Sequence, residues 1–167
     1  LYGAARQDMQ LMLIGPAAAL SAAIASLIAF GALVTAFIRS DFSVALVANH
    51  SHSAKPLIYK ISGTWGNHEG SLLLWILILM IYGAVLALSG RGMPTRLKAR
   101  ILAVQGMISS GFLAFSLFTS NPFARLADAP TDGKGLNPIL QDPGLAIHPP
   151  MLYLSLIHIS EPTRPLY

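Results

Sequence analysis

The chain contains no cysteine and few charged residues. Because none of its 167 residues is Cys, a disulfide framework and a thiolate metal site are both excluded. Charged residues make up only 11% of the chain, whereas a soluble domain averages roughly 25%. Any metal chemistry therefore depends on His, Asp, Glu or Met, and the composition argues against a soluble domain.

Apolar residues are abundant and come in blocks. They make up 54% of the chain, and the mean hydropathy is +0.60. Uncharged runs cover residues 11–38, 70–90 and 101–120, and a membrane-spanning helix needs roughly 20 residues. We predict an all-α fold, a polytopic integral membrane helical bundle, and we expect Pro16 to start the first helix.

A fourth apolar run begins at Met151 and soon meets Pro162 and Arg164, which cannot continue a transmembrane helix. The final residues also resemble a translated sequencing adapter. We therefore expect a membrane domain over residues 1–154 and a non-native tail over residues 155–167. Since the first residue is not Met, we further expect the chain to be a fragment of a longer protein.

The loop over residues 91–100 carries four positive charges and no acid. A short basic loop between two spans is explained by the positive-inside rule better than by nucleic-acid binding, so we place it in the cytoplasm. The loops over residues 40–70 and 121–150 must then lie together on the opposite face. That face carries the histidines that precede the tail: His50, His52, His68 and His148.

Residues 63–75 place two ionisable side chains at the edge of the second span. His68 and Glu69 stand between Trp65 and Trp75, and tryptophan favours the membrane–water boundary. Ionisable groups at such a place are functional candidates. The other interpretation, which stays open, is that this segment only caps the helix, since Glu suits a helix N-terminus.

His50 and His52 have a His-x-His spacing. In an extended segment both rings point to one side, where they can ligate a metal. Because no third ligand is evident nearby, a solvated loop is the favoured interpretation.

His148 is followed directly by Pro149 and Pro150. A residue before proline is disfavoured in the helical conformation, and Pro150 suits the first turn of the next span. We therefore predict that His148 is held in an extended turn at the membrane surface, just outside a helix. A rigidly held imidazole is a suitable axial ligand for haem iron, and the alternative is a histidine that only hydrogen-bonds the loop backbone.

Three segments, in this order, resemble the CcmF haem lyase family of cytochrome c maturation. They read Thr-Trp-Gly-Asn-His-Glu-Gly-Ser-Leu-Leu-Leu-Trp over residues 64–75, Phe-Thr-Ser-Asn-Pro-Phe over residues 118–123, and Leu-Asn-Pro-Ile-Leu-Gln-Asp-Pro-Gly-Leu-Ala-Ile-His-Pro-Pro-Met-Leu-Tyr over residues 136–153. The related haem lyases of nitrite reductase assembly share these motifs, so the client cytochrome stays open.

The resemblance implies a multi-pass protein of the bacterial inner membrane with periplasmic histidine loops. It implies that haem b comes from a haem chaperone and is attached to the Cys-x-x-Cys-His segment of an apocytochrome c, with other cytochrome c maturation membrane proteins as partners. The family's haem-ligating His falls on His148. We add Trp65, His68 and Glu69 as neighbours without an assigned role, and we assign no catalytic residue.

In that family a second axial His and a Trp-rich haem-handling segment lie further downstream, so we expect this chain alone to be inactive. Two other classes of function stay open. One is a transport subunit with His68 and Glu69 in a proton or ion path, and the other is a membrane scaffold without a cofactor.

Overall fold

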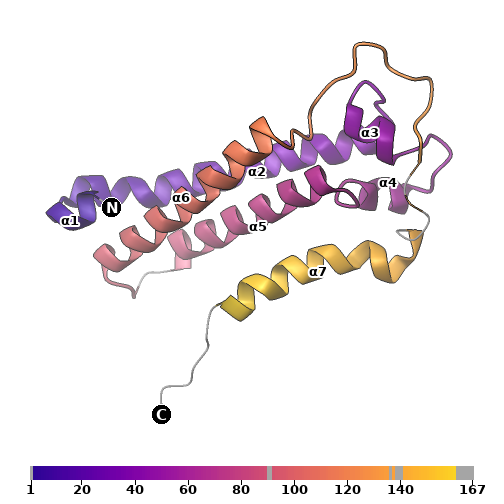
Figure 1. Ribbon diagram of the computed structural model, residues 1–167. Coiled ribbons are helices and arrows are strands. Elements are labelled where there is room, and N and C mark those ends of the chain that lie inside the picture. The colour runs from indigo at the N-terminus through magenta and orange to yellow at the C-terminus, as the bar shows by residue number, and fades with distance from the viewer. Residues whose placement is uncertain (1, 90–91, 136, 138–140, 161–167) are drawn as a thin grey trace. The chain divides into compact units, whose positions relative to one another are not determined.

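Helices dominate the computed structural model of the chain, which describes residues 2–89, 92–135, 137 and 141–160, the last five of them by their backbone only. Within these ranges there is no strand, apart from an isolated bridge between Val44 and Arg125. The all-α prediction is confirmed. Figure 1 shows the helices of the described residues, which are α1 (Tyr2–Arg6), α2 (Met9–Arg39), α3 (Ala45–His50), α4 (Leu57–Gly63), α5 (His68–Ser89), α6 (Thr95–Phe118) and α7 (Pro143–Ser160).

Three of these helices, α2, α5 and α6, are long and apolar enough to cross a membrane. They lie where the sequence predicts spans, which confirms a multi-pass membrane protein. The start of α6 differs from the prediction, because the helix begins at Thr95 directly after Pro94. Arg96, Lys98 and Arg100 therefore lie on the first turns of α6 and not in a loop.

The contacts divide the chain into two units. Unit 1 comprises Leu1–Gly31 and Ile76–Ser120, and unit 2 comprises Ala32–Trp75 and Asn121–Tyr167. The helices α2 and α5 contribute residues to both units. All four histidines whose side chains are described belong to unit 2.

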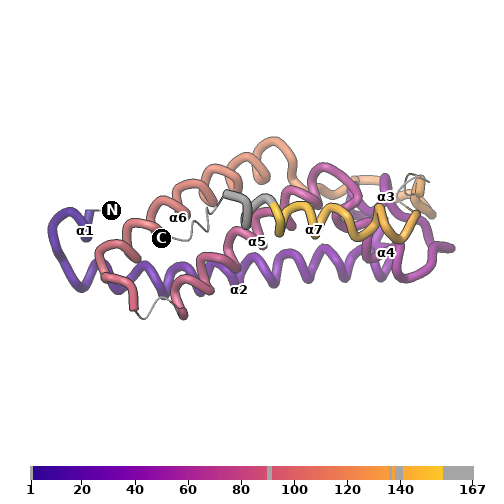
Figure 2. Tube along the Cα trace, turned by 90° about the horizontal axis from the view of Figure 1, so that it is seen from below, coloured from indigo at the N-terminus to yellow at the C-terminus, as the bar shows by residue number. Residues whose placement is uncertain are grey.

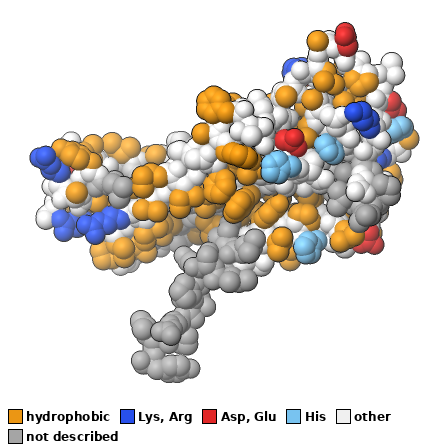
Figure 3. Space-filling model, in the orientation of Figure 1, with side chains coloured by type: hydrophobic (Ala, Val, Ile, Leu, Met, Phe, Trp, Pro, Cys, Tyr) orange, Lys and Arg blue, Asp and Glu red, His pale blue; other side chains and the backbone are white. Residues whose placement is uncertain are grey.

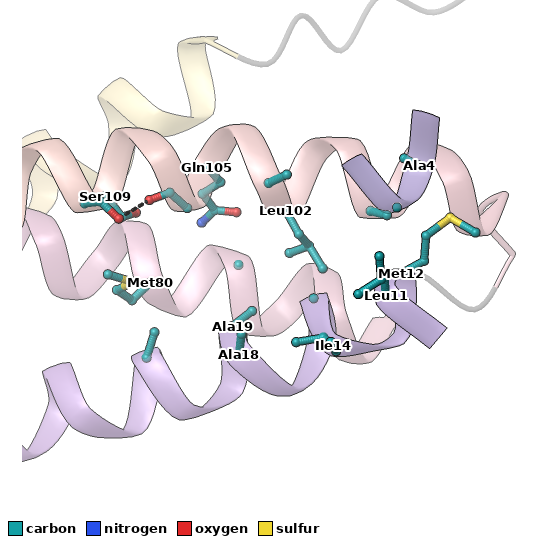
Figure 4. Close-up of a pocket in the computed structure, with 18 of the residues that line it drawn as sticks. Ala4, Leu11, Met12, Ile14, Ala18, Ala19, Met80, Leu102, Gln105 and Ser109 are labelled. Atoms are coloured by element: carbon teal, nitrogen blue, oxygen red, sulfur yellow. Dashed lines mark hydrogen bonds between the residues drawn. The ribbon is translucent and has the colours of Figure 1, made fainter. Parts of the chain in front are cut away.

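In unit 1, parts of α2, α5 and α6 lie side by side, and α1 packs against α6. Small residues allow this close approach in a membrane. Gly83 of α5 faces the side chain of Gln105, whose amide donates a hydrogen bond to the carbonyl of Leu79. A cavity of about 450 Å³ remains among these helices, lined largely by Ala, Gly and Leu, with Gln105 and Ser109 among its polar residues (Figure 4).

Unit 2 contains the point where α2 ends. Ser40 adopts a left-handed backbone with φ of 54° and donates its N–H to the carbonyl of Phe37 at 3.2 Å. Asp41 donates its N–H to the carbonyl of Ala36 at 3.0 Å. This pair of bonds is the Schellman arrangement that terminates helices, and it ends α2 at Arg39, one residue beyond the uncharged run.

The two polar loops lie together in unit 2. The segment over residues 121–135 runs along α3, where Ala45 donates its N–H to the carbonyl of Ala124 at 2.8 Å. Further along, Lys134 donates its N–H to the carbonyl of Ala48 at 2.8 Å. The next short helix, α4, contacts α7, as the tube in Figure 2 also shows. The two loops therefore contact each other, whereas the side of the membrane on which they lie stays a prediction.

The prediction for Pro16 is wrong, because this residue lies within α2 and not at its start. The helix begins at Met9, one residue after Asp8. A carboxylate oxygen of Asp8 accepts the N–H groups of Gln10 at 3.0 Å and Leu11 at 3.2 Å. A side-chain cap of this kind satisfies the first free N–H groups, so the helix starts there and continues through the proline.

Candidate functional site

The helix α7 begins earlier than the sequence predicts, at Pro143 and not at Met151. One carboxylate oxygen of Asp142 accepts the N–H groups of Gly144 at 2.8 Å and Leu145 at 3.1 Å. Aspartate before the first turn and proline in the first helical position are both favourable at a helix N-terminus. This cap explains why the loop ends at Asp142.

His148 therefore lies inside α7, together with Pro149 and Pro150. The prediction of an extended turn is wrong, because the cap starts the helix upstream and membrane helices tolerate proline when other groups bind the freed carbonyls. The side chain of His148 is exposed. Within the described part of the chain, no hydrogen bond or ion pair engages its ring, so the alternative of a backbone-bonded histidine finds no partner there.

The face of the molecule shown in Figure 3 carries histidine side chains at the surface, close to hydrophobic side chains. This combination suits a ligand that is both apolar and metal-bearing. On α7, for example, the exposed His148 follows Ile147, which is 57% exposed.

Trp65 and Trp75 both contact α7. The indole N–H of Trp65, in the turn after α4, donates to the carbonyl of Ala146 at 2.7 Å. The ring of Trp75 stacks on that of Tyr153, with ring centroids 6.2 Å apart and an angle of 12° between the planes. The segment that the sequence singles out thus holds the helix that carries His148.

His68 and Glu69 occupy the first turn of α5, but neither of them is the cap. The side-chain oxygen of Asn67 accepts the N–H of Gly70 at 2.7 Å and performs that role. His68 is exposed and Glu69 is half-buried. Both residues belong to unit 2, as does His148. Among the described residues, however, no hydrogen bond or ion pair joins either of them to His148.

Asp132 joins the two polar loops by its carboxylate. The hydroxyl of Ser53 donates to one oxygen at 2.5 Å, and the N–H of Ser53 donates to the other at 2.9 Å. The ring Nε2 of His52 lies 3.4 Å from the carboxylate. The Ser53 hydroxyl is the main reason why the pKa of Asp132 falls to about 2, with smaller contributions from the N–H groups of Ser53 and Gly133 and from His52.

The histidine pair of the first loop does not form a metal site by itself. The ring Nδ1 of His50 lies 3.1 Å from the carbonyl of Leu46, and His52 is directed at Asp132. Among the described residues there is no group of three or more His, Cys, Asp or Glu side chains that could hold a metal ion. The two histidines thus have different partners.

The polar groups that fix this region are absent from the predictions made from the sequence. The pair Asp142 and Pro143 is a recognisable helix start, and it could have been used to place α7. The bonds between Ser53 and Asp132 join residues 79 apart in the chain. A local sequence pattern cannot predict such a pair. The bond from Trp65 to Ala146 joins residues 81 apart and cannot be predicted from a local pattern either.

Several curated proteins similar to this chain carry the name of a cytochrome c-type biogenesis protein. The cytochrome c-type biogenesis protein ccl1 of Rhodobacter capsulatus is 59% identical over 133 residues, which cover 80% of this chain and 20% of that protein. CycK of Rhizobium meliloti is 54% identical over 160 residues, 96% of this chain and 24% of that protein. NrfE of Haemophilus influenzae is 42% identical over 134 residues, 80% of this chain and 21% of that protein.

The chain thus spans between a fifth and a quarter of the length of these relatives. No solved structure matches it. The model of the cytochrome c assembly protein family matches residues 65–160, from Trp65 through the whole of α7. That match takes in the tryptophan contacts and His148, and the chain belongs to the cytochrome c assembly protein family.

Proposed function

We propose that this chain forms the His148-bearing part of a membrane haem lyase that acts in cytochrome c maturation. The observation that carries the proposal is the state of His148, an exposed histidine on a capped helix whose ring has no partner in the described part of the chain. Such a ring can give a nitrogen lone pair to haem iron. The family membership supports the setting.

Haem b is the substrate in this proposal, and the residues present fit it. The ring of His148 is accessible, and exposed apolar side chains such as Ile147 and Met151 accompany it on α7. These side chains can cover the apolar porphyrin, while His148 orients it through the iron. A second ligand of the iron would come from outside this chain.

The reaction adds the thiols of a Cys-x-x-Cys-His client to the vinyl groups of haem. The chain itself contains no cysteine, so the client apocytochrome c supplies both sulfurs. The task of this chain is to hold haem in a fixed orientation while the client approaches, and such positioning lowers the entropy cost of the reaction. A haem chaperone delivers the substrate, and other maturation proteins share the membrane.

A maturation assay tests the proposal. A chimera in which this chain replaces the matching part of the Rhizobium meliloti relative is expressed in a host that lacks its own copy. His148→Ala is expected to abolish covalent c-type cytochrome, measured by haem staining after denaturing electrophoresis. His50→Ala and His52→Ala are the controls and should retain most of it. Full maturation with His148→Ala would contradict the proposal.

The location in the inner membrane, with residues 40–70 and 121–150 in the periplasm, is part of the proposal. It is supported by the basic residues at the start of α6. Single cysteines at Ser53 and Lys134 are expected to react with an impermeant thiol reagent in intact cells, whereas one at Thr95 should stay protected. The reverse pattern of labelling would overturn the assignment of faces.

A further inference from the structure

Two consecutive prolines free two carbonyl groups in α7. In an α-helix the N–H of each residue bonds the carbonyl four residues earlier, and proline has no N–H. Pro149 therefore leaves the carbonyl of Leu145 without its helical donor, and Pro150 does the same for Ala146. Leu145 is 43% exposed, whereas Ala146 is only 6% exposed, so the second carbonyl is the one that lies away from solvent.

Trp65 supplies the missing donor to that buried group. Its indole N–H donates to the carbonyl of Ala146 at 2.7 Å, which is a good length for such a bond. A buried carbonyl without a donor is costly, most of all near a bilayer. The proline and the tryptophan are therefore complementary, since one removes a donor and the other replaces it.

A second contact lies on the same face of α7. Residues four and seven positions apart share a helix face, so Ala146, Pro150 and Tyr153 form one row. Trp65 bonds the first of them and Trp75 stacks on the last. His148 lies about 200° around the helix from Ala146, since successive residues turn by about 100°, and its side chain is exposed.

We propose that Trp65 is a positioning residue that fixes the rotation of α7 through the carbonyl freed by Pro150, and so determines where His148 is presented. The hydrogen bond has a single acceptor, so a rotation or a shift of α7 by one residue breaks it. Packing alone tolerates such movements more easily. The part of this inference that concerns haem rests on the proposed function, whereas the coupling between Trp65 and Pro150 does not.

A double-mutant cycle tests the coupling without haem. Hydrogen exchange of the α7 amides is measured in the chain in lipid nanodiscs, for Trp65→Phe, Pro150→Ala and the double variant. Trp65→Phe should raise exchange about tenfold, the size expected when a buried carbonyl loses its donor. With Pro150→Ala the helix has its own donor again, so adding Trp65→Phe should change exchange by less than about twofold.

Trp75→Phe is the matched control. It removes ring area that stacks on Tyr153, three residues away from Pro150, so its effect should be equal with Pro150 and with Ala at this position. If Trp65→Phe has the same effect in both backgrounds as well, Trp65 acts by packing alone and the inference is overturned.

Haem provides the second readout, in the chimera described above. Trp65→Phe should lower the fraction of low-spin haem, and the double variant with Pro150→Ala should recover most of it. Without recovery, Trp65 does not position His148. A coupled exchange cycle together with an unchanged haem spectrum for His148→Ala would instead refute the proposed function and leave the helix coupling intact.

Discussion

The interactions within unit 1 differ from those within unit 2. In unit 1 the helices present many large apolar side chains outward, for example Leu13 at 62% and Ile28 at 67% exposure, as lipid contact requires. In unit 2 the segments are joined by hydrogen bonds between residues far apart in the chain, such as Ser53 with Asp132 and Trp65 with Ala146. Unit 2 therefore adds individual long-range polar contacts to its own buried apolar side chains, such as Phe37 and Val47.

This difference has a functional consequence. Lipid-facing helices tolerate many substitutions that keep them apolar, whereas a bonded loop region fixes particular side chains in place. A residue that must hold a ligand belongs in the second kind of region. His148, which we propose to bind haem, lies there, on a helix with a cap at its start and two tryptophan contacts along one face.

The largest expected difference between the units concerns glycine. A Cβ on Gly70 would lie 1.7 Å from the carbonyl oxygen of Thr64, and one on Gly133 would lie 2.0 Å from that of Ser51. Because both obstacles are backbone, Gly70→Ala and Gly133→Ala should destabilise unit 2 by about 3 kcal/mol. Thermal unfolding in nanodiscs, followed by tryptophan fluorescence, measures this loss.

Gly106→Ala in α6 is the matched control in unit 1, where the added Cβ meets no described atom within 4 Å. Alanine is the better helix former by about 1 kcal/mol, so the variant should be neutral or slightly stabilising. Equal losses for Gly106→Ala and Gly70→Ala would remove the distinction between the units.

The sequence predicts unit 1 better than unit 2, and the reason is physical. Long uncharged runs are sufficient to place α2, α5 and α6, because the bilayer fixes the length and composition of a span. The start of α7 and the helical conformation of His148 depend on the cap by Asp142. This cap opposes the preference of a residue before proline for an extended conformation. The bond from Trp65 to Ala146 forms only when the fold brings these distant residues together, so it cannot be predicted from the local sequence.

Helix caps give the next largest effect, with one comparable aspartate in each unit. Asp142→Ala removes the oxygen that holds the first N–H groups of α7 and should destabilise that end by about 1 kcal/mol. Asp8→Ala removes the same kind of cap from α2, but this helix is a 31-residue apolar span and should fray only in its first turn. Hydrogen exchange of the two helices measures both effects.

The smallest effect is a pH dependence confined to unit 2. The pKa of Asp132 is lowered to about 2 by the Ser53 hydroxyl and the neighbouring N–H groups. A lowered pKa means that the ionised carboxylate stabilises the loop contact above its ordinary pKa of roughly 4, and that this stability is lost as the pH falls towards 2. Exchange of residues 121–135, corrected for intrinsic rates, should rise between about pH 4 and pH 2.

Asp132→Asn is the control for this dependence. The amide does not ionise, so the variant should show faster exchange at neutral pH and no further rise on acidification. If the acid-induced rise persists with Asn at this position, another group is responsible.

The most direct test of the account is the ligation of haem iron by His148. The chimera is purified with haem, and its optical and electron paramagnetic resonance spectra are recorded for the unmodified protein, for His148→Ala and for His50→Ala. Only His148→Ala is expected to lose the low-spin signal, and added imidazole should restore it in part by binding the iron in place of the lost histidine. An unchanged low-spin signal in His148→Ala would show that this histidine does not bind the iron.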